Sequence, residues 1–260
     1  LSKLIDEYES AKDKDTQQLY GELITANIYR IQQGDASINV LNYYTNEEVT
    51  IPLDPTKSPS VNAQYYYKQY NRMKTREKEL DLQIALTREN IDYFANIEQQ
   101  LEHITVDEID DIRDELAEQG FMKQRKNTKK KKQDKIHLQT YISSDGDTIL
   151  VGKNNKQNDY LTNRKAQKSH IWFHTKDIPG SHVVILNDAP SETTIKEAAM
   201  LAGYFSKAGN SGQIPVDYTE IKNVHKPSGA KPGFVTYDNQ KTLYATPDYD
   251  QIQRMKQDKN

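Results

Sequence analysis

The sequence of 260 residues contains no cysteine and only one tryptophan. The missing cysteines exclude disulfide bonds and thiolate metal sites, and they make a reducing cytosol the default compartment. Hydrophobic residues make up only 35% of the chain. Its apolar runs are far shorter than the roughly 20 residues that a membrane-spanning helix needs, so we expect no membrane segment. Such a composition favours extended helices over a single compact core.

Acidic and basic residues are unevenly distributed along the chain. Residues 1–122 carry 12 Lys and Arg against 24 Asp and Glu, whereas residues 123–260 carry 23 against 14. The sign changes at the run KQRKNTKKKKQDK, residues 123–135, and we place the domain boundary there. We interpret this run as a basic linker that also contacts a polyanion, because each lysine near a phosphate releases counterions. The chain begins at Leu1, without a methionine and inside a predicted helix, so we expect a piece of a longer protein.

The acidic half, residues 1–122, has the pattern of a coiled-coil arm. Apolar residues recur every three and four positions along one seam. The seam consists of Tyr66, Tyr70, Met73, Leu80, Ile84, Ile91, Phe94 and Leu101. Ser58 and Pro59 suit the start of this helix, which we expect to run from about 59 to 102. A second helix, residues 4–31, ends before Gly34 and should lie antiparallel to the first.

A small β-containing tip is predicted between the two helices, at about residues 36–58. Residues 38–44 and 49–53 are rich in strand-forming side chains and flank the polar turn 45–48, which is typical of a β-hairpin. After the long helix, Thr105 and Glu108 predict a capping box for a short helix that ends near Gly120.

Tyrosines and cations gather near the predicted tip, in the segment NAQYYYKQYNRMKTR. Aromatic residues interleaved with cations can bind RNA or a protein, and tyrosines can equally pack a hairpin onto its helix. The sequence leaves both interpretations open. The candidate partner-binding residues at the tip are Tyr43, Tyr44, Tyr67, Lys68 and Arg72.

The basic half, residues 136–260, predicts a compact α+β domain. Two strand-like runs flank Ser144-Asp145-Gly146, which is a hairpin signal. The polar stretch 153–159 follows, and Asn158 can cap a helix to about residue 168. A polar turn before a helix presents N–H groups and amides to an anion, although a plain solvent-facing turn fits the spacing as well. A later helix should run from about Thr194, with Glu197 in its cap, to Ser206.

The stretch IWFHTKDIPGSHVVI, residues 171–185, reads as two strands around a polar interruption. Side chains alternate along a strand, so Trp172 and His174 should share one face while Phe173 enters the core on the other. The histidines lack the helical spacing of a zinc site, and Ser181 beside His182 does not make a catalytic dyad. We therefore expect neither a metal nor a catalytic residue here.

Three segments resemble the signature of a known RNA-binding domain. LVGKNNKQNDYLT, IWFHTKDIPGSHVVI and KPSGAKPGFVTY look like segments of the NFACT-R domain, and IPLDPTKSPSVNAQYYYKQYNRMK resembles the coiled-coil middle region that precedes it. Together they resemble the C-terminal half of the RqcH family, also called fibronectin-binding protein A, with NEMF among its eukaryotic relatives. The resemblance implies an α+β protein with a long antiparallel coiled-coil arm, a small β-containing tip and a compact NFACT-R domain.

The resemblance also implies a function, with no enzymatic activity and no cofactor. It implies a cytoplasmic, ribosome-associated quality-control factor that binds the large ribosomal subunit, at its rRNA and stalk-base region, when peptidyl-tRNA obstructs it. The family recruits tRNA, alanyl-tRNA in bacteria, and supports template-free alanine tailing of the stalled chain. The alternative is a fibronectin-binding adhesin displayed on the surface.

Together the residues and the resemblance assign an RNA-binding face in which loops carry cations beside amides and rings. Contacts to phosphate and ribose would give affinity, and base stacking would add to it if Trp172 were exposed. The candidate nucleic-acid-binding residues are Lys153, Asn154, Asn155, Lys156, Asn158, Trp172, His174, Lys176, Ser181, His182, Lys226 and Lys231.

Overall fold

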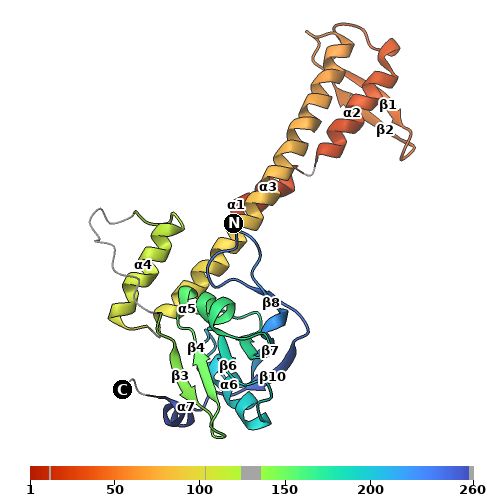
Figure 1. Ribbon diagram of the computed structural model, residues 1–260. Helices are drawn as coiled ribbons and strands as arrows, with labels where there is room; N and C mark the ends of the chain where they lie inside the picture. Colours follow the sequence, from red (N-terminus) through yellow and green to blue (C-terminus); the bar gives the residue numbers. More distant parts are fainter. Residues whose placement is uncertain (12, 103, 124–135, 258–260) are drawn as a thin grey trace. The chain divides into compact units, whose positions relative to one another are not determined.

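The computed structural model describes residues 1–11, 13–102, 104–123 and 136–257. These residues form two compact units, Leu1–Ile91 and Asp92–Asn260, and the long helix α3 contributes to both (Figure 1). The fold class is α+β, as the sequence predicts. Most of the predicted basic linker, residues 124–135, lies outside the described residues, so the domain boundary at 123–135 stays a prediction.

Three helices build the first unit. They are α1 (Ser2–Ala11), α2 (Lys14–Ala26) and the first part of α3 (Pro59–Leu101), and a short 3-10 turn, Ile28–Arg30, follows α2. The 43-residue α3 confirms the predicted long helix. The single helix predicted over 4–31 is wrong, because the backbone of Asp13 leaves helical geometry at φ −74° and ψ 11°. The apolar spacing is also interrupted between Ala11 and Leu19, so a continuous helix would bury no stripe there.

Helix α2 packs antiparallel to α3. The ring of Tyr20 in the middle of α2 meets that of Tyr66 edge to face at 5.4 Å, while Lys14 at the start of α2 forms an ion pair with Glu77 at 2.6 Å. Residue numbers therefore rise along one helix as they fall along the other. Buried Leu23 and Ile24 fill the space between the helices.

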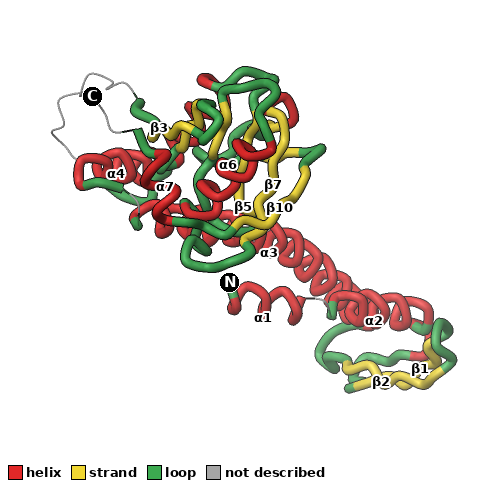
Figure 2. Tube along the Cα trace, turned by 90° about the horizontal axis from the view of Figure 1, so that it is seen from below, coloured by secondary structure: helices red, strands yellow, loops and turns green. Residues whose placement is uncertain are grey.

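The predicted hairpin is present, with strands β1 (Ser37–Asn42) and β2 (Glu47–Pro52) paired antiparallel. Its turn occupies residues 43–46 rather than 45–48, and Asn46 adopts the left-handed region at φ 59° that asparagine tolerates. Figure 2 shows the hairpin beside α2. Buried Ile38, Val40 and Ile51 pack there against the helices, which joins the hairpin to the core of the unit.

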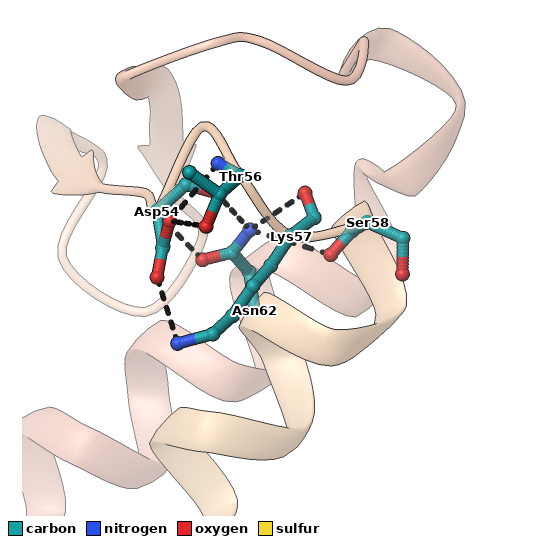
Figure 3. Close-up of polar contacts among 5 residues, drawn as sticks. All are labelled: Asp54, Thr56, Lys57, Ser58 and Asn62. Atoms are coloured by element: carbon teal, nitrogen blue, oxygen red, sulfur yellow. Dashed lines mark hydrogen bonds and ion pairs between the residues drawn. The ribbon is translucent and has the colours of Figure 1, made fainter.

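A buried asparagine fixes the connection from β2 into α3 (Figure 3). The Asn62 side chain accepts a hydrogen bond from the Asp54 backbone N–H at 2.8 Å and donates to the Asp54 carbonyl at 3.1 Å. Asp54 in turn accepts from Thr56 and pairs with Lys57 at 2.7 Å. These bonds stabilise the turn before the helix, since buried polar groups need partners.

The second unit is built on a six-stranded antiparallel sheet of order β10-β7-β5-β6-β4-β3. The strands are β3 (Gln139–Ile142), β4 (Thr148–Val151), β5 (Ile171–Thr175), β6 (Val183–Ile185), β7 (Ile214–Glu220) and β10 (Lys241–Ala245). A separate pair, β8 (Val224–His225) and β9 (Thr236–Tyr237), and the 3-10 turn Ile221–Asn223 follow β7. The final helix is α7 (Tyr249–Met255).

Helix α6 (Glu192–Tyr204) covers one face of the sheet, where its small residues Ala198, Ala199 and Ala202 allow close approach (Figure 2). Phe173 is buried in this core, as predicted. The predicted start at about Thr194 lies after the observed start at Glu192. Ser191 is the N-cap and its side chain accepts from the Thr194 N–H at 3.1 Å. Glu197 is instead buried, where it accepts from the Ser144 backbone N–H at 2.9 Å.

The end of α3 and the short helix α4 (Ile109–Glu118) belong to this second unit. The predicted capping box is confirmed, since Thr105 N–H donates to Glu108 at 2.9 Å in the 3-10 turn Val106–Glu108 that leads into α4. Buried Tyr93, Ile97 and Ile112 join the two helices.

The predicted seam is correct at Tyr66, Leu80 and Ile84, which are buried. It is wrong beyond them, because Phe94 and Leu101 are 43% and 52% exposed while Tyr93 and Ile97 are buried instead. The buried side of a helix is set by the element that packs against it. Near its C-terminal end α3 packs on α4, which lies against another side of the helix.

Candidate nucleic-acid interface

The first signature segment forms a compact turn between β4 and helix α5 (Asn155–Tyr160), which continues as a π-helical turn, Leu161–Lys165. Gly152 is required here, because an added Cβ would lie 2.8 Å from the Asn158 backbone nitrogen. Asn154 caps the helix by accepting from the Gln157 N–H at 2.8 Å, and Lys153 N–H donates to the Gln157 side chain at 2.8 Å. The predicted cap at Asn158 and the predicted polar turn over 153–159 are therefore wrong.

Asn158 has a different role, since it joins α5 to the start of β6. Its side-chain oxygen accepts from the His182 backbone N–H at 3.1 Å, and the His182 ring shares a hydrogen bond of 2.8 Å with Thr162. Asn154, Asn155 and Asn158 are all almost fully buried. The Asn154 and Asn158 oxygens accept from backbone N–H groups and Asn155 bonds to Glu115 and Gln100, so these buried side chains are poorly placed to meet an external anion.

Helix α4 presents a line of carboxylates to the same segment. Glu108, just before α4, pairs with Lys153 at 2.8 Å, and Glu118 at its end pairs with Lys156 at 3.6 Å. Between them the Glu115 carboxylate accepts from the Asn155 amide at 2.9 Å. Residues spaced by seven and three along a helix share one face, so this acidic face of α4 lies on the signature segment.

The middle of this contact is buried. Glu115 is 1% exposed and also accepts from the Tyr93 hydroxyl at 2.8 Å, while Gln100 donates to Asn155 at 2.7 Å. Burial raises the pKa of Glu115, and burial together with the Glu115 bond raises the pKa of Tyr93. Burial also opposes ionisation of Glu108, but its bonds to Lys153 and Thr105 outweigh burial and lower its pKa.

The second signature segment is internal. Trp172 is fully buried, with its ring 4.8 Å from that of Tyr237 and 5.8 Å from that of half-buried His174. The condition for base stacking by Trp172 is therefore not met. The alternation of β5 is confirmed, because Trp172 and Phe173 enter the separate cores on the two faces of the sheet.

Burial dominates the electrostatics of the two neighbouring histidines. Burial lowers the pKa of His174, and burial plus the nearby His174 ring lowers the pKa of His182 well below its ordinary value. Both rings are thus neutral near pH 7. Ser181 is also buried, and its backbone N–H donates to the Phe205 carbonyl at 3.0 Å. Among the predicted contacts of this stretch, Lys176 is the exposed one.

A hollow of about 400 Å³, with charged side chains at its edge, opens beside α5. We call it the cationic hollow. It is lined by Glu118, Ile136, Lys156, Asp159, Tyr160, Asn163, Arg164, Lys226 and Pro232. Two of the predicted contacts, Lys156 and Lys226, meet here. Sequence reasoning missed Tyr160, Asn163 and Arg164, although the basic end of YLTNRKAQK directly follows the signature and could have indicated them.

The third signature segment lines one side of this hollow. Lys226 forms an ion pair with Asp159, and Asp159 also accepts from the Gly233 backbone N–H at 3.0 Å. Lys231, by contrast, lies over the Tyr93 ring at 4.9 Å and the Phe121 ring at 5.4 Å, and so makes cation–π contacts with the α3–α4 region. The loop between β8 and β9 therefore places Lys226 in the hollow and Lys231 against packed aromatic rings.

The predicted tip residues divide between surface and core. Tyr43 and Tyr44 are 55% and 69% exposed, and their rings lie 4.6 Å apart. Tyr67 is half-buried against Gly21, whose added Cβ would meet its ring at 3.1 Å. Exposed Lys68 and Arg72 line a groove of about 630 Å³ along α3 together with Asn71, Thr75, Arg76 and Glu79.

Among the described residues, no three His, Asp or Glu side chains gather as a metal site would need. Over the same residues, no helix is long and apolar enough to cross a membrane. The role of every predicted contact residue stays a prediction.

Comparison with known proteins gives two family matches. Residues 1–135 match the family described as NFACT N-terminal and middle domains, and residues 137–239 match the NFACT protein RNA binding domain. The chain is 51% identical over 260 residues to a Bacillus subtilis (strain 168) protein named Rqc2 homolog RqcH. That alignment covers 98% of this chain and 45% of the relative.

A second relative of the same name, from Streptococcus suis (strain 05ZYH33), is 45% identical over 259 residues, covering 98% of this chain and 47% of the relative. The chain thus spans about half the length of the curated relatives it matches. A solved structure of the C-terminal of the fibronectin/fibrinogen-binding protein from Streptococcus suis superposes with a TM-score of 0.73 at 40% identity. The match covers 98% of this chain and 91% of that one.

Proposed function

The chain belongs to the NFACT protein family, and from this premise we propose that it is part of a ribosome-associated quality-control factor. Its C-terminal domain binds RNA of the large ribosomal subunit that peptidyl-tRNA obstructs. The match of residues 137–239 to an RNA binding domain carries the proposal. The relatives named Rqc2 homolog RqcH support it, since they align with nearly the whole chain.

The finer activity belongs to the same proposal. The whole protein recruits tRNA, alanyl-tRNA in the bacterial case, and supports template-free alanine tailing of the stalled nascent chain in the cytoplasm. This part of it supplies ribosomal and tRNA contacts and performs no chemistry. The arm tip, with exposed Tyr43, Tyr44, Lys68 and Arg72, supplies a second contact near the stalk base.

Surface cations of the C-terminal domain suit phosphate contacts that do not read sequence. Arg164, Lys165 and Lys168 follow one another on the exposed stretch after α5, and Lys176 and Lys226 are also exposed. Each such contact releases counterions, so binding should weaken steeply with salt. Base stacking by Trp172 is not part of this function, because Trp172 is buried.

Co-sedimentation of the 260-residue chain with purified large subunits, at several salt concentrations, tests the proposal. We expect binding that falls with salt, and a shallower fall after Lys176 and Lys226 are both changed to Gln, by about one counterion per lost contact. Lys153 is left unchanged, because its side chain is only 12% exposed and pairs with Glu108, which gives it a structural role. Salt-independent binding, or none, would contradict the function.

Fibronectin binding is the second candidate, favoured by the likeness to the fibronectin/fibrinogen-binding protein of Streptococcus suis. The same variant separates the two. If the lysine changes abolish binding to immobilised fibronectin and leave large-subunit binding unaltered, the adhesin is the better assignment. Loss of subunit binding alone supports the ribosomal one.

A further inference from the structure

We propose that the cationic hollow is a subsite for an RNA phosphodiester and that the Glu118 carboxylate of α4 competes with the phosphate for it. The inference rests on the proposed function and deepens it by naming where the RNA backbone binds. It also assigns α4 a part that neither the family match nor the signature segments indicate.

Three cations converge on the hollow from two separate stretches of chain. Lys156 and Arg164 come from α5 and the π-helical turn after it, and Lys226 comes from the loop that follows β8. Within the part of the chain that the structure describes, Arg164 is exposed and forms no ion pair. A guanidinium presents parallel N–H donors that match two phosphate oxygens, so Arg164 is the natural first contact for a phosphodiester.

Non-cationic groups of the hollow suit a nucleotide. Tyr160 offers a half-buried ring and Asn163 an exposed amide, both on the wall that carries Arg164. Stacking and ribose contacts of this kind do not depend on base identity. At about 400 Å³ the space is of the size of a small-molecule site and fits one nucleotide unit rather than a helix.

Two carboxylates oppose the three cations, and they differ in how firmly they are held. Asp159 pairs with Lys226 and accepts the Gly233 backbone N–H, so it belongs to the wall of the hollow. Glu118 has a side chain 58% exposed and holds Lys156 at 3.6 Å, from the last residue of α4. An exposed ion pair of this length is weak and exchanges readily with water or with another anion.

Burial decides which part of the α4 contact can open. Glu115, three residues earlier, is 1% exposed with two hydrogen bonds to its carboxylate, and removing it would leave buried groups without partners. The final turn, with Glu118, can therefore release its cation while the rest of α4 stays in place. Release of Lys156 adds a second unpaired positive group beside Arg164 where the phosphate arrives, which couples RNA binding to the end of α4.

The test is fluorescence-monitored binding of the full 260-residue chain to deacylated tRNA and to purified large subunits at low salt. The two probes distinguish tRNA from ribosomal RNA as the source of the phosphodiester. Arg164→Gln should weaken binding to the probe that occupies the hollow about three- to tenfold. Arg164→Lys should retain only part of the binding, because it keeps the charge but lacks the paired N–H donors. Glu118→Gln should tighten binding about two- to fivefold by freeing Lys156.

Matched controls come from an exposed ion pair on α6, Glu192 with Lys196 at 2.7 Å, which does not line the hollow. Lys196→Gln and Glu192→Gln make the same charge changes elsewhere on the domain. The gain from Glu118→Gln should vanish in a Lys156→Gln background, because the competitor acts through that lysine. Melting temperatures confirm that each variant is folded.

If the wild-type chain binds and Arg164→Gln binds as tightly as Lys196→Gln does, the hollow is not the subsite, and the proposed function stands. If Glu118→Gln gains no more than Glu192→Gln, the competition by α4 is refuted. Absence of wild-type binding to both probes overturns this inference and the proposed function together.

Discussion

Trp172 and Phe173 are neighbours in β5, and each is fully buried in a different core. The sheet is therefore covered on both faces at this strand, and the segment reaches the surface in the polar interruption after it, at Lys176 and Asp177. Residue type alone could not distinguish a buried tryptophan from one that stacks on a base, since both use the same flat ring.

Phe173→Ala should destabilise the protein by about 3 to 5 kcal/mol, because it removes a ring from a packed core and leaves a cavity. Urea denaturation of the C-terminal domain measures the change. Tyr244→Ala on β10 is the control, since this tyrosine is 66% exposed and should cost less than about 1 kcal/mol. Equal losses for the two variants would mean that Phe173 is not a core residue.

Glu115 should make stability depend on pH. Its folded pKa lies above the ordinary value of 4.5, so the folded state binds more protons than the unfolded one just above pH 4.5. The contribution of this group is thus complete below pH 4.5 and is lost as the pH rises through the folded pKa.

Glu115→Gln should remove that loss while keeping the fold, because one oxygen accepts both the Tyr93 hydroxyl and the Asn155 amide, and an amide oxygen can replace it. Denaturation at several pH values above 4.5 gives the slope of the free energy of unfolding against pH. Glu118→Gln, which alters an exposed carboxylate of the same helix, should leave the wild-type slope. An unchanged slope in Glu115→Gln would argue against the buried ionisation.

At the scale of elements, the signature turn is shaped by what packs against it. Gly152 lies against the Asn158 backbone, Asn154 accepts from the Gln157 N–H, and Asn158 accepts from the His182 N–H beside β6. Carboxylates of the α4 segment bind Lys153 and Asn155. Helix α5 begins where Asn154 can cap it. The sequence predicts the cap at Asn158, but that side chain binds the His182 backbone N–H beside β6, and Asn154 caps the helix instead.

Gly152→Ala should destabilise the domain by about 1 to 3 kcal/mol, because the new methyl group meets the Asn158 backbone, which α5 holds in place. Thermal unfolding measures this. At Gly212 an added Cβ finds its nearest neighbour, Thr246, at an ordinary 3.7 Å, so Gly212→Ala should be neutral or slightly stabilising. Tolerance of alanine at 152 would show that the turn can shift.

At the scale of the whole molecule, residues 92–122 group with the C-terminal domain by their contacts, although their charge groups them with the acidic half. The net charge of a segment sums over all of its residues, whereas its contacts depend on the few residues that it buries. The acidic face of α4 accounts for both groupings, because its carboxylates make the segment acidic and also pair with Lys153 and Lys156 of the same compact unit.

A fragment of residues 92–260 should therefore melt at least about 5 °C above a fragment of residues 136–260, since the shorter one loses the Glu108 and Glu115 contacts and the Ile97–Ile112 packing. Differential scanning fluorimetry compares the two, with circular dichroism to confirm that both are folded. Equal melting temperatures would place the structural boundary after α4, at the lysine run.

The sequence by itself determined the long helix, the hairpin at its tip, the capping box at Thr105 and the α+β class, because helical spacing, turn residues and strand alternation are local and act within a few residues. Tertiary structure alone decided the change of seam after Ile84, the burial of Trp172 and the meeting of Lys156, Arg164 and Lys226. Each of these depends on which distant surface a side chain meets, and the free energy of burial is set by that partner rather than by neighbours in the chain.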